Sequence, residues 1–323
     1  MNNLLAPIAL FAYNRPLHTK AVLDSLALNI EAKDSILYVF CDGTKENATS
    51  DILAKIEEVR NIVKSENRFK EVIIEVQKSN KGLANSIIDG VTKVVNIHKK
   101  IIVLEDDLIL SPFFLDYMND SLIRYKTYNK VAQIGGCNFY ACGNQYPQTF
   151  FLPIPDCWGW ATWKDRWDFF NSDAVYLLNE IKSKKLEFKF DGYGSYDMMT
   201  MLEKQAKGIG NSWAIRWQAV CILNDWLTLY PSPSMANHIE SSEATHANVN
   251  ICPPLSLKKQ DFETIEIIEL PNLAEAMKIG LSGLGNNYGG KKQKNKLSFF
   301  KKYTPYLILK KLFLQFKPHN YKY

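Results

Sequence analysis

Three consecutive carboxylates, Glu105, Asp106 and Asp107, directly follow a run of four apolar residues. Like charges at the end of a buried strand repel one another more strongly than they do in water. A divalent cation that prefers oxygen ligands relieves this repulsion, and Mg²⁺ or Mn²⁺ usually binds one or two carboxylates together with phosphate oxygens of a substrate. The triplet therefore predicts a metal ion that holds a diphosphate. The alternative is that the three side chains are solvated or help to cap the helix that Pro112 opens.

Strand and helix patterns alternate over the first 135 residues. Strands are predicted at 8–13, 36–43, 71–77 and 99–107, and helices at 16–28, 51–64 and 80–95. Apolar strands separated by helices indicate an α/β fold with a mainly parallel sheet that is covered on both faces. Ligands of such sheets bind at the carboxyl ends of the strands. Asn14-Arg15, Asp42-Gly43 and the acidic triplet all lie at predicted carboxyl ends, so we expect them to share one site.

The composition excludes several classes of function. The formal net charge of +5 arises in the tail, because residues 291–323 contain ten lysines and no carboxylate. The body is mildly acidic, so we expect no nucleic-acid partner. No apolar run reaches the roughly 20 residues that span a bilayer, and residues 1–16 do not read as a signal peptide. The six cysteines include no Cys-x-x-Cys pair, which favours reduced thiols in a cytoplasmic protein.

The common nucleotide-binding loops are missing from the sequence. It contains no Gly-x-x-x-x-Gly-Lys-Ser/Thr, and no Gly-x-Gly-x-x-Gly follows the first predicted strand. Kinase and dehydrogenase chemistry is therefore disfavoured. A nucleotide diphosphate bound through a metal, without a phosphate loop, points to the enzymes that use nucleotide sugars.

Five segments resemble a known family when they are taken in order. They are "FAYNRP", "FCDG", "NKGLANSI", "VLEDDLILSPFFLDYM" and "WGWATW". The set is similar to metal-dependent GT-A glycosyltransferases, and more narrowly to the N-acetylglucosaminyltransferase I-like branch and its bacterial relatives of surface polysaccharide synthesis. The resemblance covers about residues 5–250. It implies a GT-A-like fold and the transfer of a sugar from a nucleotide diphosphate, most simply UDP, to a glycan or lipid-linked glycan.

The resemblance also implies a division of the chain. Residues 1–135 would form a Rossmann-like half that binds the nucleotide sugar and the metal. Residues 136–279, which are less regular and rich in aromatic residues, would form the acceptor-binding and catalytic half. Residues 280–323 comprise a glycine-rich linker and the basic tail.

Roles for the donor-side residues follow from the same resemblance. Arg15 would contact the nucleotide or its phosphates, a geometry that suits a guanidinium. Asp42 would accept a hydrogen bond from the uracil N–H, unless it serves only to form the Asp-Gly turn. Asn80 and Lys81 begin a helix near the donor, where backbone N–H groups and the lysine favour anions; a simple helix start is the alternative.

The metal site is assigned from the resemblance as well. Asp107 would ligate Mn²⁺ or Mg²⁺, while Glu105 and Asp106 would face the donor sugar and the ribose. The segment "SMANHIESSEATHAN" resembles the loop that closes such sites, and its His246 would bind the metal or the diphosphate. His238 is a weaker candidate for the same role.

Asp156 is the expected catalytic base, because it precedes "CWGWATW", where this branch of enzymes places the group that deprotonates the acceptor hydroxyl. An inverting transfer needs one such base, and neighbouring aromatic residues would raise its proton affinity. Asp165 and Asp168 lie close in sequence but on a predicted exposed helix face. Glu240 and Glu243 remain competitors.

Several other side chains have both a binding and a structural interpretation. The tryptophans of this region could stack on sugar rings or pack in the core: Trp158, Trp160, Trp163 and Trp167. Arg216 could bind an acceptor phosphate. In the tail, apolar residues after Pro305 fall on one side of a predicted helix and lysines mostly on the other, which suits an anionic membrane surface on the inner face of the cell membrane.

Two other functions are compatible with parts of the pattern. A sugar nucleotidyltransferase shares the sheet and the metal, but it needs a glycine-rich basic loop after the first strand, and "YNRPLHTK" has no glycine. A non-catalytic glycan-binding protein on a transferase-like fold is the other alternative, which the intact acidic triplet disfavours.

Overall fold

The computed structural model describes residues 5–138, 148–192, 196–232 and 234–239. The strands of this part are β1 (Ile8–Ala12), β2 (Ile36–Cys41), β3 (Glu71–Val76), β4 (Lys100–Glu105), β5 (Leu108–Leu110), β6 (Val131–Gly135), β7 (Thr149–Leu152), β8 (Trp160–Trp163), β9 (Leu227–Pro231) and β10 (Ala236–His238). The helices are α1 (Pro16–Ala27), α2 (Ser50–Lys64), α3 (Leu83–His98), α4 (Phe114–Arg124), α5 (Lys164–Trp167), α6 (Ala174–Ser183), α7 (Glu187–Phe190), α8 (Met198–Ala206) and α9 (Trp213–Leu223), with a 3₁₀ turn at Ala32–Asp34.

Within the described residues, eight strands form one sheet in the order β3-β2-β1-β4-β8-β6-β9-β7. The first four are parallel, β8 runs antiparallel to both β4 and β6, β9 is parallel to β6, and β7 is antiparallel to β9. The predicted α/β class, with a mainly parallel sheet flanked by helices, is confirmed. The sheet continues beyond residue 135, and the division into a donor half and an acceptor half stays a prediction about function.

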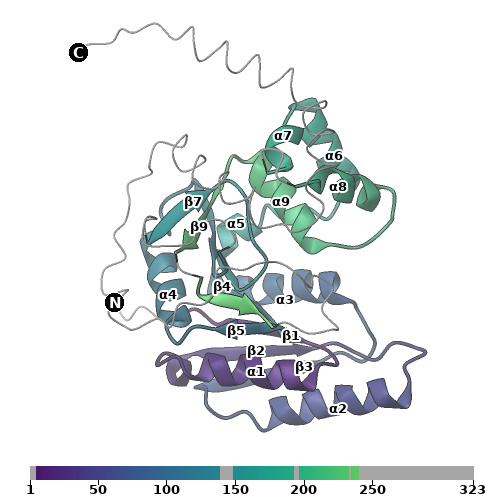
Figure 1. Cartoon of the computed structure of the whole chain (residues 1–323), viewed down its shortest axis with the longest axis vertical. Helices are drawn as coiled ribbons and strands as arrows, with labels where there is room; N and C mark the ends of the chain where they lie inside the picture. Colours follow the sequence, from purple (N-terminus) through teal and green to yellow (C-terminus); the bar gives the residue numbers. More distant parts are fainter. Residues whose placement is uncertain (1–4, 139–147, 193–195, 233, 240–323) are drawn as a thin grey trace, which may run out of the picture.

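Side chains alternate along each strand, so every inner strand contributes to two cores. In β1, Ile8 and Leu10 pack on the face covered by α1, α2 and α4, whereas Ala9 and Phe11 pack on the opposite face. That second face is covered by α3 and by the helices between residues 164 and 223. Figure 1 shows α1 and α2 on one side of β1–β3, with α3 on the other and the group α6–α9 beyond it. Both faces are closed, as near-continuous apolar strands require.

A glycine permits the close approach of α3 to the sheet. A Cβ built on Gly90 would lie 2.6 Å from the Phe11 ring and 3.1 Å from the Phe40 ring. These two rings stack, with their centroids 4.9 Å apart. A larger residue at position 90 would therefore push the helix away from β1 and β2, and with it the residues at the start of α3.

Every helix in the described part of the chain is too short or too polar to cross a bilayer. The predicted linker and basic tail, residues 280–323, lie outside the described residues.

Candidate functional site

The acidic triplet and Arg15 meet at the carboxyl ends of neighbouring strands. β1 and β4 are parallel, and Phe11 lies opposite Glu105 in their register. The chain leaves β1 and begins α1 directly after Arg15, so the guanidinium reaches the turn that follows β4. There Arg15 Nη2 donates to Asp106 Oδ1, and Nη1 donates to Asp107 Oδ2 at 3.0 Å. Because Asp106 and Asp107 are both largely shielded from water, this arginine compensates two negative charges that are poorly solvated.

Proton affinities differ across the triplet. Burial raises the pKa of Glu105 to about 8, and repulsion from Asp107 and Asp106 adds to the effect. Burial also raises the pKa of Asp106 to about 6, against the charge of Arg15. For Asp107 burial is outweighed by the hydrogen bond to His238 and the charge of Arg15, so its pKa is lowered. At pH 7 Glu105 therefore holds a proton and Asp107 is ionised.

His238 reaches Asp107 through a short strand pair. β10 pairs antiparallel with β5, with His238 opposite Leu108, directly after the triplet. His238 Nε2 lies 3.0 Å from Asp107 Oδ2, and the next amide, Ile239 N, donates to the Asp107 carbonyl at 2.8 Å. The Trp158 ring lies against the imidazole, with centroids 4.9 Å apart. The sequence-based ranking placed His238 behind His246; the structure places His238 on the triplet, and His246 lies outside the described residues.

The Asp42 carboxylate joins two loops through four hydrogen bonds, and we call this set of bonds the Asp42 latch. Its Oδ1 accepts from the amides of Gly43 and Lys81, both at 2.8 Å, and its Oδ2 accepts from Gly82 N and Asn80 Nδ2, both at 3.0 Å. A carboxylate has about four acceptor positions, so these contacts use its capacity. Asp42 thereby ties the end of β2 to the start of α3.

A glycine again permits this crossing of backbones. A Cβ on Gly43 would lie 2.2 Å from the carbonyl carbon of Ser79, so no other residue fits there without moving the loop. A pocket of about 140 Å³ opens beside the latch, between β2, β3 and α3. Asp42, Gln77 and Lys81 contribute to its wall. Lys81 Nζ also pairs with Asp89 at 2.7 Å.

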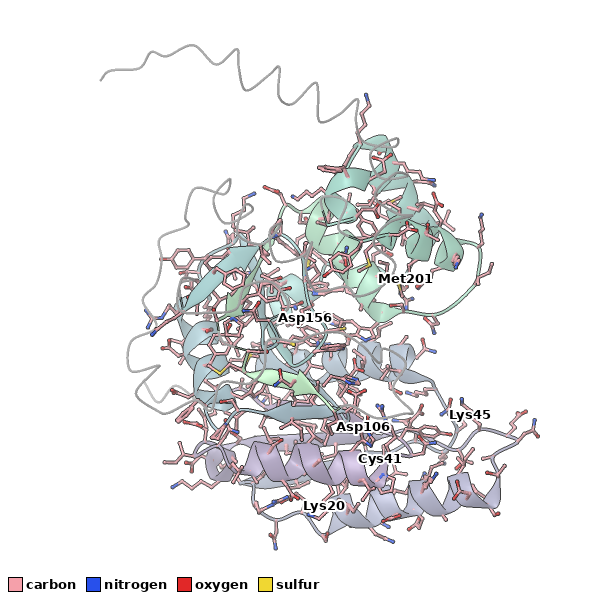
Figure 2. The ribbon with its side chains drawn as sticks, viewed as in Figure 1. Lys20, Cys41, Lys45, Asp106, Asp156 and Met201 are labelled. Atoms are coloured by element: carbon pink, nitrogen blue, oxygen red, sulfur yellow. The ribbon has the colours of Figure 1, made fainter. Side chains whose placement is uncertain are left out.

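Asp156 has one satisfied and one unsatisfied oxygen. Oδ1 accepts from the amides of Cys157 at 2.7 Å and Trp158 at 3.3 Å. Oδ2 is buried and has no hydrogen-bond partner among the described residues. Burial raises the pKa of Asp156 to about 7, although the two amides oppose the rise. Figure 2 labels Asp156 toward the centre of the molecule and Asp106 near the end of β1.

The loop of Asp156 faces the triplet. The charge of Asp156 contributes to the raised pKa of Glu105, and Trp158, two residues further on, contacts His238. The loop is held near β10 by a backbone crossing, in which Gly136 N donates to Gly159 O at 2.7 Å and Met235 N donates to Gly136 O at 2.8 Å. The structure thus brings Asp156, the triplet and His238 to one region.

The competitors for the role of base lie elsewhere. Asp165 and Asp168 have side chains that are 66% and 50% exposed, and they pair with Arg166 and Lys164, respectively. Both therefore belong to the solvated helix face that the sequence indicates. Glu240 and Glu243 lie outside the described residues.

Most of the candidate sugar-stacking residues pack in the core. Trp160, Trp163 and Trp167 are at most 3% exposed, and Trp160 stacks on Trp213 with centroids 5.0 Å apart. Trp158 is half-buried. Arg216 is also structural, because its guanidinium donates to the carbonyl of Ser212, the carbonyl of Ser172 and the side chain of Asn211.

The residues at the triplet fit a divalent cation only in part. Among the described residues there is no group of three or more His, Cys, Asp or Glu side chains that could hold a metal. Asp107 Oδ2 and His238 Nε2 are 3.0 Å apart, and neighbouring ligands of an octahedral ion with bonds of about 2.1 Å are also about 3 Å apart. An ionised carboxylate only accepts, so Nε2 now carries the proton that a metal would replace. The pair suits an ion whose other ligands are diphosphate oxygens and water.

Comparison with known proteins gives distant likenesses. The sequence matches no family model, and no curated protein is similar to it in sequence. The structure is similar to UDP-glucose pyrophosphorylase complexed with UDP-glucose, with 11% identity, a TM-score of 0.37, and coverage of 71% of this chain and 90% of that one. It is also similar to S. aureus TarS, with 14% identity and a TM-score of 0.37; the match covers 73% of this chain but 37% of TarS. Neither likeness decides what the chain does, and the function proposed below rests on its own residues.

The raised pKa of Asp156 predicts a pH-dependent stability difference. An unfolded aspartate ionises near pH 4, whereas native Asp156 holds its proton up to about pH 7. Between these values the unfolded chain binds fewer protons, so this group lowers the stability of the protein as the pH rises. Asp156→Asn removes this loss. We expect the unfolding free energy of Asp156→Asn, relative to the parent chain, to rise by on the order of 1 kcal/mol per pH unit between pH 4 and 7.

Urea unfolding at several pH values measures this difference. Asp168→Asn provides the control, because it removes an exposed carboxylate and should give a difference that hardly changes with pH. A constant difference for Asp156→Asn would show that Asp156 ionises normally in the folded protein.

Proposed function

We propose that the protein is a metal-dependent glycosyltransferase that moves a sugar from a nucleotide diphosphate, most simply UDP, to a hydroxyl group of a glycan, with inversion. One observation carries the proposal: Asp156, whose buried Oδ2 has no partner among the described residues, lies near enough to Glu105 for its charge to raise the pKa of that residue, and Arg15 and Asp107 pair at the same ends of β1 and β4. The Asp156 carboxylate suits the removal of a proton from an acceptor hydroxyl. Arg15, together with a metal ion held by Asp107, suits the stabilisation of a leaving diphosphate.

Arg15 acts on the leaving group in this proposal. Its guanidinium lies at the carboxyl end of β1, where ligands of parallel sheets bind, and its fork of N–H donors matches phosphate oxygens. Asp107 and His238 would hold Mn²⁺ or Mg²⁺, which supplies positive charge for the diphosphate. Since Asp107 now contacts both His238 and Arg15, donor binding would rearrange these contacts.

The other residues of the triplet bind the donor. Burial raises the pKa of Glu105 to about 8, and the protonated form of its side chain can donate a hydrogen bond to a sugar hydroxyl. We assign Asp106 to the ribose side of the donor. The pocket beside the Asp42 latch would receive the base, with Lys81 in its wall and Asn80 bonded to Asp42. Because the Asp42 carboxylate is fully used within the protein, it would position the loops that surround the base.

Asp156 takes the proton of the acceptor hydroxyl. A base works best when its pKa lies near the working pH, and burial raises the pKa of Asp156 to about 7. The two amides on Oδ1 fix the carboxylate and leave Oδ2 to accept the proton. A carboxylate on the acceptor side, opposite the leaving diphosphate, corresponds to a single displacement with inversion.

Turnover of nucleotide sugars tests the proposal. The full chain is incubated with Mn²⁺ or Mg²⁺, a panel of UDP-sugars and glycan acceptors, and released UDP is measured. We expect Asp107→Ala to abolish the metal-dependent release. Asp156→Asn should still bind UDP but lose transfer by about 10²- to 10⁴-fold, whereas the exposed control Asp168→Asn keeps it.

Two results would contradict the proposal. Normal turnover by Asp156→Asn would remove the assigned base. Release of diphosphate from UTP and a sugar 1-phosphate, without any transfer to glycans, would instead identify a sugar nucleotidyltransferase.

We further propose that the acceptor is a glycan or lipid-linked glycan of bacterial surface polysaccharide synthesis and that the basic tail brings the enzyme to the inner face of the cell membrane. Support comes from the sequence alone: ten lysines and no carboxylate in residues 291–323. Near an anionic surface each lysine contributes about 1 kcal/mol, and salt screens the attraction.

The tail proposal predicts sedimentation with anionic liposomes. The full chain should sediment with vesicles that contain phosphatidylserine, less so at high salt, while a chain that ends at Gly290 should stay in the supernatant. Neutral vesicles are the control. Equal sedimentation of the two chains would exclude the tail as the anchor.

A further inference from the structure

A chain of two hydrogen bonds runs from a helix of the second half to the backbone of Asp156. Trp217 of α9 donates its indole Nε1–H to Gln133 Oε1 at 2.6 Å. Gln133 of β6 in turn donates from Nε2 to the Asp156 carbonyl oxygen at 2.5 Å. Gln133 is 0% exposed and Trp217 is 1% exposed, so water cannot replace either bond. This chain is an uninterrupted polar connection through an apolar core.

The position of Gln133 in β6 depends on an irregularity of the sheet. The register of β6 against β9 shifts between Val131 and Gln133. Such bulges re-aim side chains and are common beside active sites. The adjacent Ala132 carbonyl accepts from Thr162 Oγ1 at 2.7 Å. The bulge thus directs a polar side chain toward the Asp156 loop from a strand whose other side chains are mostly apolar.

Trp217 decides which way the Gln133 amide faces. An indole N–H can only donate, so it requires the carbonyl oxygen of the glutamine. The NH₂ group must then face the opposite way, where it meets the Asp156 carbonyl. A reversed amide would place an oxygen against a carbonyl oxygen and leave the indole N–H unpaired, and each error costs free energy in a buried site.

The rest of the Asp156 loop is held in a similar way. Tyr230 OH donates to the Ile154 carbonyl at 2.8 Å, so two side chains from neighbouring strands fix two carbonyls of the segment. Asp156 Oδ1 accepts the amides that follow it. Rotation of the Asp156 peptide would therefore disturb both the Gln133 bond and the amides on Oδ1.

We propose that Gln133 is a positioning residue, oriented by Trp217, which fixes the Asp156 backbone so that Oδ1 stays engaged and Oδ2 remains available to the acceptor hydroxyl. The inference rests on the proposed function of Asp156, but its structural part is measurable without any activity. Loss of the N–H groups of Gln133 should loosen the Asp156 loop and misplace the Asp156 carboxylate. The proposed nucleotide-sugar site at β1 and β4 should stay intact.

Hydrogen exchange of the Cys157 and Trp158 amides tests the positioning directly in the full chain. Gln133→Met keeps the volume but removes both hydrogen bonds, and we expect it to accelerate exchange of these amides about tenfold or more. Trp217→Phe, which frees the amide to reverse, should act in the same direction. Thr162→Val is the matched control, because it removes one buried hydrogen bond from the same strands and should leave the two amides as protected as in the parent chain.

Gln133→Glu gives a readout that a packing role would not produce. A protonated glutamic acid can donate to the Asp156 carbonyl as the amide does, whereas the ionised form cannot. The exchange rate of the Cys157 and Trp158 amides in Gln133→Glu, divided by their rate in the parent chain, should therefore fall toward one as the pH is lowered from 8 to 5. With UDP-sugar and acceptor, kcat of Gln133→Met should fall by about 10- to 100-fold while KM for the donor changes less than about twofold.

The outcomes separate the two levels of the proposal. Unchanged amide protection in Gln133→Met, or a Gln133→Glu ratio that stays as far above one at pH 5 as at pH 8, overturns the positioning role even if Asp156 is the base. If the loop loosens but Asp156→Asn turns over normally, the assignment of the base is wrong and Gln133 fixes a loop of another purpose. Should Gln133→Met fail to fold, the Gln133→Glu series decides alone.

Discussion

The ion pairs of Arg15 with Asp106 and Asp107 are the contact on which the candidate site depends. Buried charges are stable only when they are paired, and removal of one partner typically costs about 3–5 kcal/mol. The pairing is possible because β1 and β4 are adjacent and parallel, so the end of one strand faces the end of the other. The same turn then begins β5, which pairs with β10 and delivers His238. The order of the strands thus places the Arg15 guanidinium, the two aspartate carboxylates and the His238 imidazole together.

Three carboxylates around this region have different hydrogen-bond partners, and these partners give them different chemistry. Asp107 meets an arginine and a histidine and stays ionised. Asp42 meets four N–H donors and serves as a latch. Asp156 meets two amides on one oxygen and none on the other, and burial raises its pKa to about 7. Of these three, Asp156 alone combines an unpaired oxygen with a proton affinity suited to exchange at neutral pH.

Much of the fold of residues 1–135 is predictable from the sequence, because its signals are local. Apolar runs of four to six residues specify β1, β2 and β4, and Pro16 marks the start of α1. Parallel strands then require Arg15 and the triplet to lie at one edge of the sheet. The relief of charge repulsion in the triplet was expected from a metal. The structure adds a second source of relief, because Arg15 pairs with Asp106 and Asp107, and the metal stays a prediction. Burial, which the sequence does not display, raises the pKa of Glu105 to about 8.

The features that sequence patterns miss depend on long-range pairing. β10 has three residues, too few for a periodic signal, and His238 meets a residue far earlier in the chain. Gln133 interrupts an apolar strand, and in the sequence it looks like a polar residue that the strand merely tolerates. The shift in register beside it directs its side chain toward the Asp156 loop. The sequence allows both sugar stacking and core packing for the four tryptophans. Three of them pack in the core, because helices and strands cover them on both faces of the sheet.

Calorimetric titration of the full chain with UDP, with Mn²⁺ present and with EDTA in its place, tests the central claim most directly. If Asp107 and His238 hold a metal that receives the diphosphate, UDP should bind with Mn²⁺ and only weakly without it. Equal binding of UDP in Mn²⁺ and in EDTA would contradict a metal–diphosphate site at the ends of β1 and β4.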